Sequence, residues 1–297
     1  MQVSVAYLAV LLIWSTTPLG IVWSSETINP TMAVLLRMLI AVILGSLVIC
    51  IAKIELPLHK QAIRLYSFSA LGIFGGMSFS YLAAGYLSSG VLSLSFGLAP
   101  VFSAILARRI LAEPKISSVR KLSMLLSLVG LALVCSDKFS LEGDSIYGLF
   151  FILTAVFLFS LSGVLVKSIS LAIHPLSTTV GALIVSLPLF IINWLLLDGS
   201  LDISGWQLRS VWSTLYLGVF GSLIGFFAYF FVLQKLSPST VALITLVTPV
   251  IALSLGAALN NEIISNKILI GAFMVILGLA IYYWGELLMT KLRNINR

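Results

Sequence analysis

Charged residues are scarce in this sequence: Asp, Glu, Lys and Arg together make up 9% of its 297 residues. Soluble globular domains carry about 25% charged residues, which help to keep their surfaces in contact with water. Hydrophobic residues make up 60% of the chain. So few charges cannot cover a protein of this size in water, and the sequence therefore predicts a protein that lies in a lipid bilayer.

Cysteine and histidine are also rare, with two of each. Cys50 and Cys135 lie within or at the end of apolar segments, and His59 and His174 lie in predicted loops. Disulfide frameworks and metal sites need more such residues at closer spacing. The sequence also lacks a His-Glu-x-x-His motif, a Gly-x-Ser-x-Gly motif and a carboxylate pair at membrane depth. We expect no metal, no other cofactor and no enzyme activity.

Ten long apolar segments fill the chain and leave only short connections between them. A hydrocarbon core about 30 Å thick is crossed by about 20 helical residues. Continuous apolar runs favour helices over the alternating strands of a membrane barrel. The first segment has no basic start and is too long for a signal peptide, so we expect it to be a membrane helix. The predicted helices are 3–24, 31–52, 62–86, 88–110, 119–136, 146–170, 176–197, 209–235, 238–260 and 266–288.

The basic residues are distributed unevenly between the two predicted faces. With both termini inside, three basic residues fall on the outer face: Lys138, Arg209 and Lys267. Thirteen fall on the inner face: Lys53, Lys60, Arg64, Arg108, Arg109, Lys115, Arg120, Lys121, Lys167, Lys235, Lys291, Arg293 and Arg297. The positive-inside rule then predicts a multi-pass protein of a bacterial inner membrane with both termini in the cytoplasm. The net charge of +7 is explained by this orientation and needs no nucleic acid as a partner.

Several of the rarer residues recur at a nearly constant spacing along the chain. Pro30 recurs as Pro175 at an offset of 145. At an offset of 149 the recurring pairs are Gly72 and Gly221, Gly76 and Gly225, Ser88 and Ser237, Pro100 and Pro249, and Glu113 and Glu262. This agreement predicts an internal duplication. Residues 1–140 and 141–297 are the two predicted halves, and each holds five helices, an odd number, so the second half is expected to enter the membrane inverted.

Short motifs in both halves resemble a known transporter family. They are Trp14-Ser15, the stretch Pro30–Arg37, Ala99-Pro100 followed by Glu113, Thr248-Pro249 followed by Glu262, and Gly278-Leu279-Ala280. Together they are similar to EamA-type members of the drug/metabolite transporter (DMT) superfamily. The resemblance implies an all-α integral membrane protein of ten transmembrane helices in two inverted five-helix repeats, which exports amino acids or related small metabolites. Ala182 stands where the repeat would put an arginine, and Val22 and Trp23 stand where many relatives carry a lysine. These departures leave the substrate open.

Inverted repeats place a substrate site between the two halves near the middle of the bilayer. Prolines inside predicted helices free the carbonyl four residues earlier, which can then line a wet cavity or simply allow a packing kink. Hydroxyl-bearing helix faces can bind substrate or serve only close packing. Aromatic residues away from the helix ends add an apolar surface. The candidate substrate-binding residues are Trp14, Arg37, Tyr81, Ser93, Phe96, Pro100, Tyr229, Thr245 and Pro249.

Arg37 is the one basic residue well inside a predicted helix. A charge at membrane depth indicates function, and Arg37 could bind a substrate carboxylate. It lies about six residues, or about 9 Å, from the outer helix end, so a structural role with a side chain that snorkels to the surface is the alternative.

No Asp or Glu lies near the centre of any predicted helix. Exchangers that trade protons for cations need such a carboxylate, so a neutral or zwitterionic substrate fits better. The alternative is a multidrug or lipophilic-cation exporter of the same fold. A channel is a further alternative from another class. The expected partners are the lipid bilayer and a small-molecule substrate, and the sequence leaves both a monomer and a homodimer open.

Overall fold

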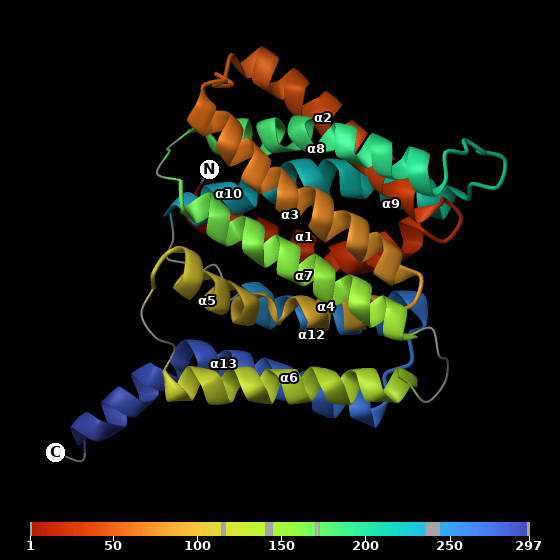
Figure 1. Ribbon diagram of the computed structural model, residues 1–297. Helices are drawn as coiled ribbons and strands as arrows, with labels where there is room; N and C mark the ends of the chain where they lie inside the picture. The colour runs from red at the N-terminus through yellow and green to blue at the C-terminus, as the bar shows by residue number, and fades with distance from the viewer. Residues whose placement is uncertain are drawn as a thin grey trace.

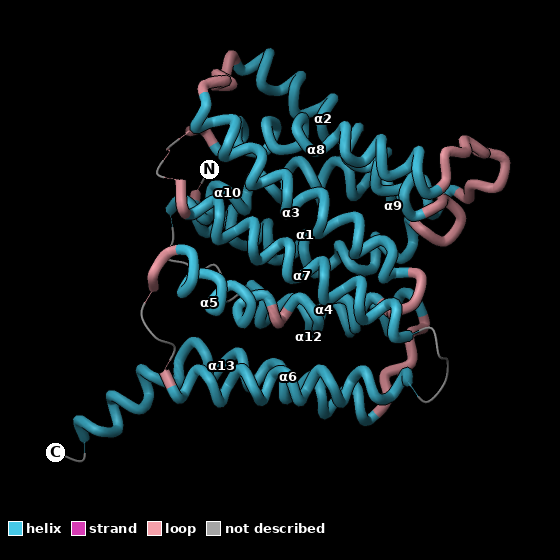
Figure 2. Tube along the Cα trace, viewed as in Figure 1, coloured by secondary structure: helices cyan, strands magenta, loops and turns pink. Residues whose placement is uncertain are grey.

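The computed structural model describes residues 2–113, 117–139, 145–169, 171, 173–235 and 244–295. These residues are helical apart from short connections, with no strand among them (Figure 2). The helices are α1 (Val3–Ser24), α2 (Pro30–Ala52), α3 (Lys60–Ala84), α4 (Ser89–Phe96), α5 (Ala99–Ile110), α6 (Ser118–Phe139), α7 (Ser145–Lys167), α8 (Pro175–Leu197), α9 (Leu208–Tyr216), α10 (Gly225–Lys235), α12 (Ile244–Asn260) and α13 (Asn266–Ile295). A π-helical segment, η1 (Leu217–Ile224), joins α9 to α10.

The helical membrane fold expected from the sequence is confirmed. Within the described residues, seven helical segments are long and apolar enough to cross a bilayer. Val247–Asn260 and Asn266–Tyr282 are shorter apolar helices. Large apolar side chains such as Ile43 and Leu195 are exposed on the outer surface of the bundle, where lipid rather than water is the favourable environment.

Two of the predicted helices are irregular. The segment predicted at 88–110 divides into α4 and α5, and Pro100 lies in the first turn of α5. A proline there removes one helical hydrogen bond and clashes with the carbonyl of Phe96, so the chain breaks at Gly97-Leu98. The other irregular helix, predicted at 209–235, contains η1. Pro18, Pro188 and Pro249 lie inside helices that remain continuous.

Pro30 and Pro175, which recur at an offset of 145, have the same local structure. Asn29 caps α2 by accepting a 3.0 Å hydrogen bond from the amide of Thr31, and Pro30 begins the helix. His174 caps α8 in the same way through its Nδ1, and Pro175 begins that helix. Proline suits the first helical position because the amide it lacks has no helical partner there. The duplicated motif is thus a helix start.

Most of the helices lie side by side and run between two ends of the molecule, with both chain termini at the same end (Figure 1). The central helix α1 contacts α4, α9, α10 and α12, while α3 packs against α7 and α8. The helices α6 and α13 pack along each other. Their backbones touch at Gly130 and Gly271, where a Cβ atom added to Gly271 would lie 2.5 Å from the Gly130 carbonyl oxygen.

Candidate functional site

A cavity lies in the middle of the bundle, between helices of both halves of the chain. Its empty volume is about 770 Å³, counted with the part that opens to solvent. Aromatic side chains form much of its wall: Trp14, Phe96, Phe159 and Phe226. The polar side chains in the wall are Thr17, Arg37, Ser80, Ser93 and Thr248.

Four of the nine residues predicted to bind substrate lie together in this wall: Trp14, Arg37, Ser93 and Phe96. They come from α1, α2 and α4, so the fold brings together side chains that are far apart in the sequence. Their location supports the prediction without testing their role.

The other five predicted residues are not among the described wall residues. Tyr229 packs against the wall residue Trp14, with ring centroids 5.1 Å apart, and lines a smaller neighbouring cavity. The buried Tyr81 accepts a 3.3 Å hydrogen bond from the Ser24 hydroxyl. Pro100 and Pro249 are sequence neighbours of the wall residues Ala99 and Thr248. The side chain of Thr245 lies outside the described residues.

The remaining wall residues were not among the predicted site residues. Thr17 and Ile21 follow Trp14 at three and seven residues along α1, so helical spacing could have indicated them. Met77 and Leu92 are common apolar residues with no such signal. They become wall residues only through the packing of α3 and α4 around the cavity.

Arg37 is fully buried, with 0% of its surface exposed. Its side chain therefore does not snorkel to the outer surface, and that part of the structural alternative was wrong. Its Nε donates a 2.7 Å hydrogen bond to the Ser222 hydroxyl in η1, and its guanidinium carbon lies 6.0 Å from the ring centre of Tyr81. Its Nη1 has no hydrogen-bond partner within the described part of the chain.

The π-helical segment accommodates Arg37 at the cavity. A Cβ atom added to Gly221 would lie 3.1 Å from Arg37 Nη2, and one added to Gly218 would lie 3.1 Å from the Arg37 carbonyl oxygen. Only glycine allows α2 to pack so closely here. Single π turns inside helices occur frequently at functional sites. The segment thus presents Ser222 to Arg37 and leaves room for the guanidinium.

Comparison with known proteins identifies the family. The model of the EamA-like transporter family matches residues 3–136 and again residues 146–284. The chain belongs to the EamA-like transporter family. The two matches place one EamA repeat in each half. The protein is therefore a membrane transporter of the DMT superfamily and not an enzyme.

The names of three relatives of this EamA protein specify no substrate. It is 26% identical over 272 residues to an uncharacterized transporter of Archaeoglobus fulgidus, covering 90% of this chain and 94% of the relative. It is 23% identical over 282 residues to protein PagO of Salmonella typhimurium, covering 94% and 91%. It is 21% identical over 280 residues to the uncharacterized transporter YoaV of Bacillus subtilis, covering 94% and 95%.

A solved crystal structure has the same fold as this EamA protein. The two superpose with a TM-score of 0.69 at 16% sequence identity, over 94% of this chain and 96% of the other. At this identity the match supports the fold and carries no information on the substrate.

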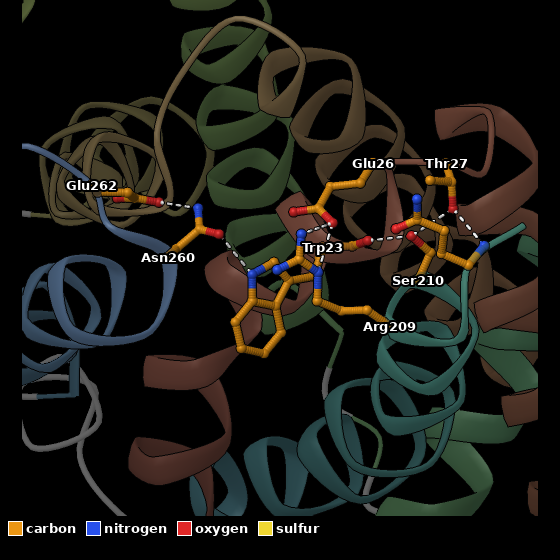
Figure 3. Close-up of polar contacts among 8 residues, drawn as sticks. Trp23, Glu26, Thr27, Arg209, Ser210, Asn260 and Glu262 are labelled. Carbon is orange, nitrogen blue, oxygen red and sulfur yellow. Dashed lines mark hydrogen bonds and ion pairs between the residues drawn. The ribbon is translucent and has the colours of Figure 1, made fainter.

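At one end of the EamA bundle, polar contacts join the two halves of the chain (Figure 3). We call the residues Trp23, Glu26, Thr27, Arg209, Ser210, Asn260 and Glu262 the Trp23 network. The Trp23 indole donates a 2.8 Å hydrogen bond to Asn260 Oδ1, and the Ser210 hydroxyl donates a 2.7 Å bond to the Trp23 carbonyl. Arg209 forms an ion pair with Glu26, with Nε 2.8 Å from the carboxylate.

Glu262 extends the Trp23 network to the start of α4. Its carboxylate accepts hydrogen bonds from the backbone amides of Ser89 at 3.0 Å and Gly90 at 3.3 Å. Asn260 donates a third, at 3.2 Å. The first amides of a helix have no partner within the helix and carry partial positive charge, so a carboxylate there stabilises the helix end. A carboxylate of the second half thus caps a helix of the first half.

Proposed function

We propose that this EamA protein is a secondary transporter of the bacterial inner membrane that exports amino acids or related small metabolites by alternating access. In this proposal residues 1–140 and 141–297 form two inverted five-helix repeats, and both termini lie in the cytoplasm. The cavity between the repeats binds the substrate and opens to one face of the membrane at a time.

The packing of the helices supports an inverted duplication. If the second half repeats the first, then α2 is equivalent to α8, α4 with α5 to α12, and α6 to α13. Among them α2 packs against α8, α4 against α12, and α6 against α13. In the same scheme α10 is equivalent to α3 and α1 is equivalent to α7. The contact between α3 and α7 therefore corresponds to the contact between α10 and α1. Such reciprocal contacts are expected of two units related by a two-fold axis in the membrane plane.

The observation that carries the proposal is a cavity that both halves line and that lies near a contact between them. Trp14 and Phe96 come from the first half, and Phe159, Phe226 and Thr248 from the second. The Trp23 network joins the halves at the face that the basic residues predict to be the outer one. Breaking this contact would allow the halves to separate there, which is how one cavity can serve both faces.

The wall of the cavity disfavours the alternative of a lipophilic-cation exporter. Among its described residues Arg37 is the one charged side chain, and no carboxylate accompanies it. A cation would meet a positive charge and no acid that could exchange it for a proton. A substrate that carries a carboxylate meets a complementary group.

A transport assay in inverted membrane vesicles tests this proposal. Radiolabelled amino acids and other small metabolites are offered with and without a proton gradient, and vesicles without the protein are the control. We expect saturable uptake of small zwitterionic metabolites. Uptake that rises linearly with concentration would indicate a pore, and saturable uptake confined to lipophilic cations would favour the alternative exporter.

A further inference from the structure

Arg37 is a buried charge whose hydrogen-bonding capacity the described residues do not fully satisfy. The guanidinium carries a positive charge at any physiological pH and five N–H donors. Nε is bonded to Ser222, whereas Nη1 has no partner among the described residues. The Arg37 side chain also forms part of the cavity wall. A bound group that enters the cavity would therefore lie beside Arg37.

Leaving such a group unpaired is unfavourable. An ionised group in a protein interior is stable only with a counter-charge or a full set of hydrogen bonds. The Trp23 network already uses two of the described carboxylates: Glu26 pairs with Arg209, and Glu262 caps α4. No acidic side chain lies in the described cavity wall. The described cavity wall thus offers Arg37 no counter-charge, and a bound ligand can supply one.

We propose that Arg37 binds the carboxylate of a singly charged organic acid, that the aromatic wall holds the acid's apolar body, and that an amino group on the ligand contributes little to its binding. This inference rests on the proposed function and narrows its substrate class. Simple monocarboxylates are then ligands as good as the corresponding amino acids.

The chemistry of the wall supports each part of this assignment. The planar donor fork of arginine fits a carboxylate, and one guanidinium balances one negative charge. The rings of Trp14, Phe96, Phe159 and Phe226 provide an apolar surface for the rest of the ligand. An ammonium group would find no carboxylate to pair with among the described wall residues.

Four compounds that share a phenethyl body and differ in charge test the inference on the purified full-length protein. They are 3-phenylpropanoate, L-phenylalanine, 3-phenylpropanamide and phenethylamine. We expect the first two to bind with affinities within about threefold of each other by calorimetric titration. The neutral amide and the cationic amine should bind at least about tenfold more weakly, since each lacks the charged acceptor for Arg37.

Two variants assign the effect to the residue. Arg37→Gln should remove the preference for the acid over the amide, and Arg37→Lys should retain part of it, because lysine keeps the charge but loses the fork. Thermal unfolding of each variant checks that it is folded. If a variant fails to fold, the comparison of the acid with the amide in the wild-type protein still tests the inference. Equal binding of acid and amide, tighter binding of the amine, a marked preference for phenylalanine over the simple acid, or no binding by any of the four overturns the inference.

The vesicle assay separates this inference from the proposed function. Saturable transport of another metabolite, combined with no preference for acids, would leave the transporter assignment standing and remove the role of Arg37. If the vesicle assay showed no saturable transport of any metabolite, the proposed function itself would be overturned.

Discussion

Ser222 holds the Nε of Arg37 at a distance of 2.7 Å across the contact between α2 and η1. The serine is fully buried, so water cannot replace its hydroxyl without a rearrangement of the helices. Ser222→Ala should lower the stability by about 1–3 kcal/mol, because it leaves a charged donor unsatisfied. The shift in thermal unfolding temperature measures this. Ser254→Ala is the matched control, since that exposed hydroxyl bonds only to the Val250 carbonyl of its own helix. Equal shifts for the two variants would contradict the role of Ser222.

Glu262 is expected to stabilise the state in which the Trp23 network is closed. Glu262→Ala removes the acceptor for the Ser89 and Gly90 amides, and bonds to a charged group contribute about 1.5–3 kcal/mol. We expect outer-face labelling of a cysteine placed at Ser93, in the cavity wall, to become at least about tenfold faster, since each 1.4 kcal/mol is a factor of ten.

Asp202→Asn is the control for the Glu262 variant. Asp202 is exposed in the loop before α9, and its bonds to the amide and hydroxyl of Ser204 stay within that loop. Those bonds lower the pKa of Asp202. They therefore stabilise the turn fully at a pH above the ordinary pKa of an aspartate, and this stabilisation is lost as the pH falls through the lowered pKa of Asp202. Similar labelling rates for the Glu262 and Asp202 variants would show that Glu262 does not hold the halves together.

At the scale of single residues, the sequence indicated some of the site and could not indicate the rest. Trp14 and Arg37 were identifiable because aromatic and charged residues are unusual at those depths. The burial of Arg37 could not be predicted, because it depends on Gly221 and Ser222, more than 180 residues away in the sequence. Phe159 was one of several aromatic residues in the predicted helices, and only the packing shows that it lies in the wall.

Among the helices, the contact between α6 and α13 depends most visibly on glycine. Gly271→Ala would place a methyl group 2.5 Å from the Gly130 carbonyl oxygen, so the two backbones must separate. Overpacking of this kind costs about 1–3 kcal/mol, and we expect a lower thermal unfolding temperature. Gly163→Ala in α7 is the matched control. Its added methyl group has no neighbour nearer than the Tyr229 hydroxyl at 4.0 Å, and alanine favours the helix by about 1 kcal/mol. A Gly271 variant as stable as the Gly163 variant would contradict this packing.

The helices themselves were predictable because membrane thickness and hydrophobicity fix their length and position. The break before Pro100 follows from local backbone chemistry, and the sequence contained that signal. The π turn of η1 had no comparable signal. It is associated with the close packing of α2 at Gly218 and Gly221, a contact between helices that no local pattern specifies.

For the molecule as a whole, the proposed inverted duplication would explain how one cavity can serve two faces. Two similar units of opposite orientation can exchange conformations, so a state open to one face implies a state open to the other. The reciprocal contacts of α2 with α8 and of α4 with α12 are consistent with this exchange. In the proposed mechanism the Trp23 network is one of two contacts that break and reform.

Cysteine accessibility tests alternating access most directly. Cys50 and Cys135 are replaced by serine, Ser93 by cysteine, and a membrane-impermeant thiol reagent is applied to right-side-out and to inverted vesicles. Two separate single-cysteine variants are the controls: one carries a cysteine at Ser200, in the loop before α9, and the other retains only Cys50, and each reports one face. We predict that the cysteine at position 93 reacts from both faces, while each control reacts from one. Reaction of position 93 from a single face, even with Glu262→Ala, would contradict a cavity that opens alternately to both sides.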